Sequence, residues 1–537
     1  MALNFPASPS TGDVHNASNG LQYHFDGVKW VSQGAYNTST INTLNFTQQG
    51  TGAVSRSVQN KLEDVVSVKD FGAKGDGTTD DTAAFQAAVN AGFPKIVVPD
   101  GRYLIESADL TIPTQVSLVT IGATPPDSTE RFTLDDKPIV LILGNSKKII
   151  LQNSASLKGL TIIQKTTFTA LAALTSGQVL TITNVNNYSG TAIQTDACPY
   201  IGYCKIIGFE RGIDTNTTNT PRGRLEHLCI DCINGVRVDN DLGGWDMYSV
   251  HSYPVVTNTD ANNIRSGIGF EFKNFSDWSF ITNCFSFNDT GFKVTDCNSI
   301  KFTSCGADHP STPKGTVGFN LQGQSRECIF TGCQTASMAV GIINQVADGF
   351  RNLFVGTVVW ESDIGLRVNN GNANVTGCSF RSITNKGILI NDKDSKALIT
   401  GTRFVSMPVA IDTAGHTTDV ADVGELLTSQ NDYETITGSV RTNEVVKNIA
   451  SATNLTLPNN DILYTITGTT TIGTLVGAGR SPNSIVILNF TGALTLNHNS
   501  SGMNLAGATN ASITAGSTVT LVYVTGNKWF ELSRSIV

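Results

Sequence analysis

The sequence lacks any segment that would direct the chain to a membrane. Its first residues, MALNFPASPS, have neither the cationic start nor the apolar core of a signal peptide. No run of apolar residues is long enough to cross a bilayer. We therefore expect a soluble chain that is not exported through a signal peptide and does not insert into membranes.

An excess of positive charge is also missing. The chain has 36 Lys and Arg residues against 44 Asp and Glu residues, which gives a formal net charge of −8. Because a basic surface is what attracts the phosphate backbone, we expect no nucleic-acid partner. Only 15% of the 537 residues are charged and 51 are Gly, which favours strands and turns over long surface helices.

The cysteines do not form a recognisable metal motif. Ten are present, and Cys229 and Cys232 make one C-x-x-C pair, but no second pair or His pair follows at the spacing of a zinc site. Without a signal peptide, thiols are expected rather than disulfides. We predict no metal and no cofactor, and assign the cysteines to packing.

A Gly- and Asp-rich stretch, VKDFGAKGDGTTDDTAAFQAAVNAG, begins at Val68 and lacks both common ligand patterns. It contains no G-x-G-x-x-G, and a calcium loop counted from Asp76 would place Ala87 where a Glu is needed. The stretch instead predicts a helix over about 82–91, capped by Asp80 or Asp81. Its apolar face is Ala84, Phe85, Ala88 and Val89.

The region from 200 to 412 contains a repeat in which Gly is followed by an apolar residue. Successive repeat glycines are separated by 23, 34, 22, 27, 23, 24, 22 and 22 residues, where Val409 takes the place of Gly at the end of the series. The repeat glycines before it are Gly212, Gly235, Gly269, Gly291, Gly318, Gly341, Gly365 and Gly387. A period in the low twenties, made of short strands without helices between them, is typical of a parallel β-helix.

A second series supports this fold through TNC, TSC, TGC, VGT, TGC and TGT segments. Their third residues are Cys284, Cys305, Cys333, Thr357, Cys378 and Thr402. Equivalent positions of successive coils stack, so small inward side chains would form a ladder. The open end of such a stack must be covered, which is the role we predict for the helix at 82–91.

VSVKDFGAKGDGTTDDTAAFQAAV, then IVVPDGRYLI, then the coil series resemble the pectate-lyase-like β-helix of bacteriophage tailspikes. The resemblance covers about residues 55 to 415 and implies an all-β fold, a right-handed parallel β-helix. The opening LNFPASPSTGDVHNASNGLQYHFDGVKWVS is similar to small modules at the start of phage tail and baseplate proteins. The closing TLVYVTGNKWFELSRS is similar to C-terminal modules of tail fibres.

These resemblances imply a domain order. Residues 1–35 would be a virion-attachment module that binds a phage tail or baseplate protein, 36–66 a linker, and 67–425 the β-helix. Residues 426–537 would be a β-sandwich-like module for trimerisation or carbohydrate binding. The family further implies a homotrimer in the phage tail, assembled in the host cytoplasm, with a host surface polysaccharide as partner.

Residues able to cleave a polysaccharide concentrate at one corner when the coils are aligned on the ladder. Asp308 and Glu361 are the preferred acids, with His309 and Asp289 beside them. Trp360 and Arg381 are candidate substrate-binding residues. The alternative is that Asp and Asn at corners only bind the local backbone. Relatives often have an acid after the next ladder Cys, whereas Gln334 stands there in this chain.

A second cluster, GGWDMYSVHSYP, falls in the longest interval between the repeat glycines. We expect a surface loop there, in which Trp245, Asp246, His251 and Tyr253 bind sugars or only fix the loop. The segment PRGRLEH, with Glu226 and His227, is expected to continue that face.

Three functions remain open at this point. The first is a tailspike that binds and cleaves a bacterial surface polysaccharide, an O-antigen, capsule or exopolysaccharide, as an endoglycosidase. The second is a polysaccharide lyase, with Arg381 neutralising an acidic sugar. The third is a receptor-binding spike without enzymatic activity.

Overall fold

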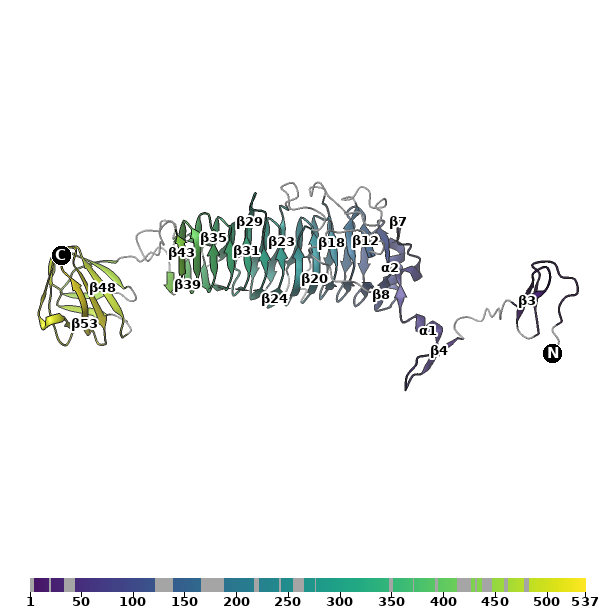
Figure 1. Ribbon diagram of the computed structural model, residues 1–537, viewed down its shortest axis with the longest axis horizontal. Helices are drawn as coiled ribbons and strands as arrows, with labels where there is room; N and C mark the ends of the chain where they lie inside the picture. Colours follow the sequence, from purple (N-terminus) through teal and green to yellow (C-terminus); the bar gives the residue numbers. More distant parts are fainter. Residues whose placement is uncertain are drawn as a thin grey trace. The chain divides into compact units, whose positions relative to one another are not determined.

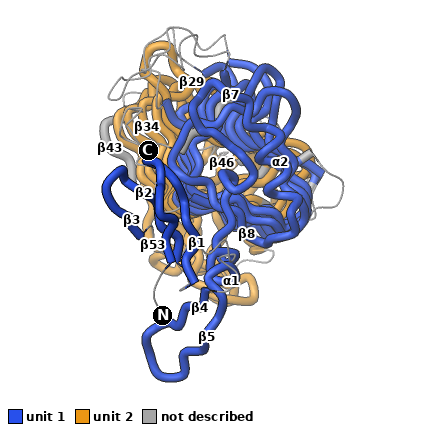
Figure 2. The backbone as a smooth tube through the Cα atoms, turned by 90° about the vertical axis from the view of Figure 1, so that its right-hand side faces the viewer, with its two compact units in different colours: residues 1–288 blue, residues 289–537 orange. Residues whose placement is uncertain are grey.

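The computed structural model describes residues 4–18, 21–32, 44–120, 139–165, 188–216, 222–240, 243–254, 265–275, 277–346, 351–369, 371–391, 395–412, 426–429, 432–436, 447–457, 462–477 and 482–537. The chain divides into two compact units, residues 1–288 and 289–537 (Figure 2). Within the described residues, no helix has the length and apolar content needed to span a bilayer.

A small antiparallel sheet opens the first unit, and its core is aromatic. Phe5 stacks on Trp30 at 5.3 Å between ring centroids and meets Tyr23 edge-on at 4.9 Å. A hairpin and a short helix follow before the β-helix. The elements are β1 (Val14–Asn16), β2 (Gln22–Phe25), β3 (Trp30–Ser32), β4 (Asn45–Thr47), β5 (Ser55–Ser57) and α1 (Val58–Leu62).

The main body is a parallel β-helix, as predicted, in which each regular coil adds one strand to one sheet and two short strands to a second (Figure 1). In the first unit, the one-strand sheet is β10 (Leu110–Ile112), β13 (Ile149–Leu151), β16 (Thr191–Thr195), β19 (Arg211–Asn216), β21 (Asn234–Asp239) and β23 (Ile268–Phe275). The second sheet contains β6 (Val66–Ser67), β7 (Asp76–Asp80), β8 (Lys95–Val98), β9 (Gly101–Ile105), β11 (Ser117–Thr120), β12 (Ile139–Leu143), β14 (Ser156–Lys158), β15 (Thr161–Gln164), β17 (Tyr200–Gly202), β18 (Lys205–Ile207), β20 (Arg224–Asp231), β22 (Asp246–Ser252), β24 (Ser279–Thr282) and β25 (Phe285–Ser286).

The second unit repeats this arrangement. Its one-strand sheet is β26 (Thr290–Cys297), β29 (Gly315–Gly323), β32 (Met338–Val346), β35 (Ile364–Asn369), β38 (Lys386–Ile390) and β41 (Val409–Asp412). The paired strands are β27 (Ile300–Thr303), β28 (Gly306–Ala307), β30 (Ile329–Thr331), β31 (Gln334–Ala336), β33 (Arg351–Val355), β34 (Val358–Trp360), β36 (Asn372–Thr376), β37 (Ser379–Arg381), β39 (Lys396–Thr400), β40 (Arg403–Met407), β42 (Leu426–Ser429) and β43 (Asp432–Ile436). Because β42 and β43 still pair in parallel with β39 and β40, the β-helix continues past the expected boundary at 425.

Ladder positions point inward along the coils. All six ladder residues named above are at most 2% exposed. Beside them, stacked phenylalanines fill the interior. The ring centroids of Phe302 and Phe330 lie 4.7 Å apart, and those of Phe330 and Phe354 lie 5.0 Å apart. The apolar interior therefore depends on the same side chain type recurring at one position of successive coils.

The helix α2 (Thr82–Asn90) lies against β10, the first strand of its sheet. Gln86 donates from Nε2 to the Thr111 carbonyl at 2.9 Å and accepts the Thr111 N–H at 3.1 Å, so its amide replaces a neighbouring strand. Asp80 accepts the Thr82 N–H at 3.0 Å, whereas Asp81 accepts from Lys74 and Gly75. The parallel stack already begins before this helix, since β6 and β7 precede α2 in the chain and pair with β8 and β9.

The C-terminal part of the second unit has its own core, centred on Trp529, Tyr464 and Leu488. Trp529 donates from Nε1 to the Leu475 carbonyl at 3.0 Å. Parallel pairing gives way to antiparallel pairing in the sheet β44-β46-β48-β52-β53-β50. The strands are β44 (Lys447–Ala450), β45 (Asn454–Leu457), β46 (Leu463–Thr467), β47 (Thr474–Gly477), β48 (Ile485–Phe490), β49 (Leu494–Leu496), β50 (Met503–Asn504), β51 (Ala511–Ile513), β52 (Thr518–Tyr523) and β53 (Trp529–Ser535).

Candidate functional site

The predicted corner in the second unit is built from strand ends held in register. Ala336, Trp360, Arg381 and Val405 are paired from coil to coil. The next residue of each coil turns the chain with a left-handed backbone, at φ values of 55°, 53°, 51° and 56° for Ser337, Glu361, Ser382 and Ser406. We call this the acidic corner, because Glu361 replaces the serine of the other three coils.

Asp308 lies on the coil that pairs with β31, since Ala307 pairs with Thr335. Its side chain is half-buried, and its Oδ1 accepts the His309 backbone N–H at 2.7 Å. Burial raises the pKa of Asp308 above its usual range, and the negative charge of Glu361 raises it further. The hydrogen bond and charge of His309 oppose this rise in pKa without cancelling it. Asp308 is thus a carboxyl with an increased tendency to hold its proton.

His309 lies behind Asp308 and is only 4% exposed. Its Nδ1 is 3.0 Å from the carbonyl oxygen of Pro313. A side chain at Gly315 would place its Cβ 3.0 Å from His309 Cγ and 2.6 Å from Met338 Sδ, so glycine is needed for the close approach. The position of His309 suits holding the turn that carries Asp308, and its burial keeps the ring from the solvent face.

Glu361 is exposed, and its backbone N–H donates to the Arg381 carbonyl at 3.2 Å. The exposed Arg381 guanidinium lies 5.2 Å from the centre of the half-buried Trp360 ring. The arrangement therefore combines a carboxylate, a cation and an aromatic face on two adjacent coils.

Asp289 is bound to its neighbouring coil. Its Oδ1 accepts hydrogen bonds from Thr316 Oγ1 at 2.9 Å and from the Thr316 N–H at 3.2 Å. These contacts hold β29 in register and occupy one carboxylate oxygen.

An ion pair next to the corner was not found from the sequence. Lys314 Nζ lies 2.6 Å from Asp363 Oδ1, which also accepts from Thr384 Oγ1 at 2.6 Å. Partial burial acts to raise the pKa of Asp363, but the hydrogen bonds from Lys314 and Thr384 lower it overall. The only sequence signal was the longer interval that carries Lys314.

The second predicted cluster is not the loop we expected. Asp246 and His251 lie in strand β22, because Met247 and Val250 point into the core and the left-handed Ser249 between them resets the alternation. Trp245 is 1% exposed, so its ring is packed inside and presents no face to solvent. The rings of Tyr253 and His251 pack against Phe285, with centroid distances of 6.0 Å and 6.2 Å. Burial lowers the pKa of His251.

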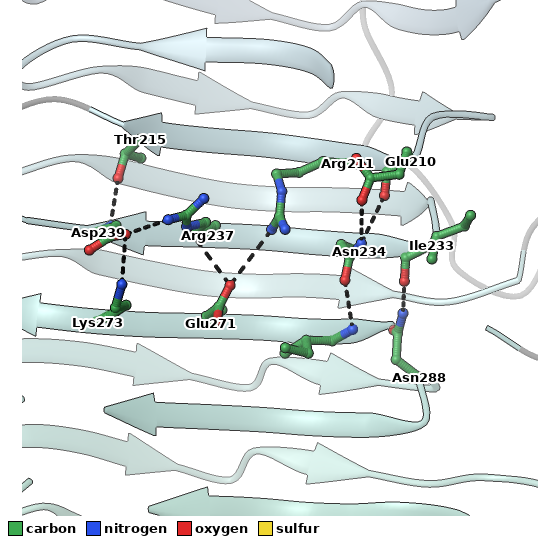
Figure 3. A network of polar contacts seen from close by, with 11 residues as sticks. Glu210, Arg211, Thr215, Ile233, Asn234, Arg237, Asp239, Glu271, Lys273 and Asn288 are labelled. Atoms are coloured by element: carbon green, nitrogen blue, oxygen red, sulfur yellow. Dashed lines mark hydrogen bonds and ion pairs between the residues drawn. The ribbon is translucent and has the colours of Figure 1, made fainter. Parts of the chain in front are cut away.

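A charged network on β19, β21 and β23 was also missed (Figure 3). Glu271 lies 4.0 Å from Arg211 and 3.8 Å from Arg237, and Asp239 binds Arg237 and Lys273. Arg237 and Glu271 each follow a repeat Gly by two residues, and they pair across the sheet. Aligning the coils on Gly, rather than on the ladder, would have revealed this network.

Within the described residues, no three His, Cys, Asp or Glu side chains gather as metal ligands. Residues 65–336, just over half of the chain, match the family model described as rhamnogalacturonase A/epimerase, pectate lyase-like.

Matches to individual proteins are short or distant. The tail spike protein of an Escherichia phage is 49% identical over 49 residues, which are 9% of this chain and 6% of that protein. Alginate lyase 7 of Azotobacter vinelandii is 51% identical over 47 residues, 8% of this chain and 6% of that enzyme. Tailspike protein 3 of bacteriophage CBA120 is 13% identical, with a TM-score of 0.47 over 99% of this chain and 86% of that one. The matched segments thus span only 6% of each of these two curated relatives.

Proposed function

Because the chain belongs to the pectate-lyase-like family of rhamnogalacturonase A and epimerases, we propose that it is a phage tailspike that binds and cleaves a bacterial surface polysaccharide. Cleavage is by hydrolysis within the polysaccharide chain, at the acidic corner. The observation that carries this proposal is the pair formed by Asp308, whose pKa is raised, and the exposed Glu361.

The two acids have different environments, as a general acid and a general base require. Asp308, whose pKa is raised by burial and by the Glu361 charge, donates its proton to the glycosidic oxygen. Glu361 accepts a proton from the attacking water. Their coils are two steps apart, roughly 9.6 Å at about 4.8 Å per step, so the backbone spacing leaves room for that water between the two side chains.

The neighbouring residues support this chemistry from fixed positions. Trp360 provides an apolar surface for a sugar ring, and Arg381 donates hydrogen bonds to sugar hydroxyls beside it. His309 and Asp289 are positioning residues, because one holds the turn behind Asp308 and the other fixes the coil through Thr316. The tail attachment of the N-terminal module and the homotrimer are part of the same proposal.

The test is the rate of polysaccharide cleavage by Asp308→Asn and Glu361→Gln. Each variant retains its shape and loses acid–base ability, so each is expected to lose at least about a hundredfold in rate. New reducing ends should appear without the ultraviolet absorbance of unsaturated sugars, which elimination would produce.

Glu327→Gln is the matched control, because Glu327 is another exposed glutamate with a left-handed backbone, at φ 54°. It should cleave at the wild-type rate. Cleavage at the wild-type rate by both acid variants would remove the acidic corner from the mechanism. Ultraviolet absorbance from unsaturated sugars, appearing as cleavage begins, would identify a lyase.

A further inference from the structure

A second column of left-handed residues runs along the first unit, one residue beyond the paired positions Lys158, Gly202, Glu226 and Tyr248. Its members are Gly159, Tyr203, His227, Ser249 and Asn283, at φ values of 81°, 57°, 51°, 54° and 53°, the last following Thr282, the partner of Tyr248. In the second unit, the same position directly precedes each inward Cys or Thr of the ladder defined above. The residues there are Ser304, Gly332, Gly356, Gly377 and Gly401.

Large aromatic residues are unfavourable in this column. Left-handed backbone is the conformation that glycine adopts without steric cost, and a bulky residue such as Tyr in it is uncommon. Space is not restricted there: a Cβ added at Gly332, Gly356 or Gly377 would meet nothing within 4 Å. Tyr203 and His227 therefore project from the corner at a conformational cost, and such outliers are concentrated at functional sites.

The projecting rings form a continuous aromatic ladder. Tyr203 stacks on His227 at 4.9 Å with an interplanar angle of 26°, and His227 meets Tyr248 edge-on at 5.3 Å. Lys158 Nζ lies 5.0 Å from the Tyr203 ring centre. Tyr248 is 45% exposed, so the ladder ends at a solvent-facing ring.

Charged groups accompany the ladder in fixed positions and compensate one another. Arg224 lies 3.2 Å from Glu226 and 3.7 Å from Asp246, and the Tyr200 hydroxyl donates to Glu226. Together with Lys158, which lies over the Tyr203 ring, the surface carries two cations and two carboxylates. Such a surface offers hydrogen-bond donors and acceptors without a net charge.

We infer that the aromatic ladder Tyr203–His227–Tyr248, with Arg224, Glu226 and Asp246, is a binding surface for neutral pyranose units of a polysaccharide. Aromatic faces combined with a few convergent polar groups are typical of small-molecule and sugar sites. A second copy of the chain would fit less well, since charged residues are depleted at the core of protein interfaces. The inference rests on the proposed function for its ligand class, but it concerns binding in the first unit and no step of cleavage.

The experiment uses the full-length chain and an array of purified bacterial surface polysaccharides, neutral and acidic. Dissociation constants for the polysaccharide that the wild type binds are then measured for Tyr203→Gly, His227→Gly and Tyr248→Ala. We expect each variant to bind at least about tenfold more weakly. The two glycine variants should melt at the wild-type temperature or above it, because glycine relieves the left-handed backbone.

Ser304→Gly is the matched control, as it makes the same backbone change in the second unit, at φ 52°. It should leave the dissociation constant unchanged. Weaker binding in the ladder variants supports the inference even if Asp308→Asn and Glu361→Gln cleave normally, which would refute only the proposed function. Full binding by the ladder variants would overturn the inference alone. A change in their oligomeric mass by light scattering would also overturn it, by identifying the surface as a subunit contact.

Discussion

At the scale of the residue, the pH dependence of cleavage depends on Asp308. As a proton donor it acts only when protonated, and its pKa is raised by burial and by Glu361, so the rate should fall as the pH rises through that pKa. The charge of His309 lowers the pKa of Asp308, so the His309→Gln substitution should raise the pKa of Asp308. The fall in rate with rising pH should then occur at a higher pH. Rate profiles over pH measure this shift.

A purely structural role for His309 has a different signature. Loss of its contact with the Pro313 carbonyl would reduce the rate by a similar factor at every pH and leave the alkaline fall where it was. Glu327→Gln, at a different position of its coil, should reproduce the wild-type profile. If the rate of the His309→Gln variant fell at the same pH as that of the wild type, the proposed effect of His309 on the pKa of Asp308 would be contradicted.

At the scale of the element, α2 protects the first edge of the one-strand sheet. Gln86→Met retains bulk but leaves the Thr111 N–H and carbonyl without their side-chain partner, at a cost of about 1–3 kcal/mol. We expect hydrogen exchange at β10 to quicken by about tenfold or more, with a greater tendency to aggregate through the exposed strand. Mass spectrometry of deuterium uptake measures the exchange.

Gln59→Met is the control for this change. Gln59 lies in α1 and its amide donates to the Glu63 side chain at 2.8 Å on an exposed surface, so its loss should not alter exchange at β10. Equal exchange in both variants would mean that α2 does not protect the strand edge.

Strands were predictable from the sequence where burial makes the same kind of residue recur once per coil, and less predictable elsewhere. The spacing from Cys305 to Cys333 and onward identified the coils, because the ladder position is buried in each of these coils and holds a small side chain, Cys or Thr. The strand at 246–252 was missed because the left-handed Ser249 interrupts its alternation. The corner position of Glu361 was predictable, but the burial that raises the pKa of Asp308 was not, since it depends on how the folded chain packs around that side chain.

At the scale of the whole molecule, we predict a homotrimer. Both chain ends resemble trimeric tail modules, and the C-terminal sheet exposes apolar residues on its outer face, with Ile485 45% and Leu532 54% exposed. Light scattering should give three times the chain mass of 57.0 kDa. Ile485→Asp should weaken the assembly, because a charge is costly in a subunit interface. A wild-type monomer at micromolar concentration would contradict the prediction.

The left-handed corner columns also bear on how such a chain changes over generations. These positions face open space, since a Cβ added at Gly332 or Gly356 would meet no atom within 4 Å, while the interior is built from other positions of the same coils. A substitution in a column therefore changes the outer surface of its coil, at the conformational cost of left-handed backbone, and leaves the packed interior positions as they were. Under the function proposed above, specificity for a host polysaccharide can then change by single substitutions, one coil at a time, while the packed interior is retained.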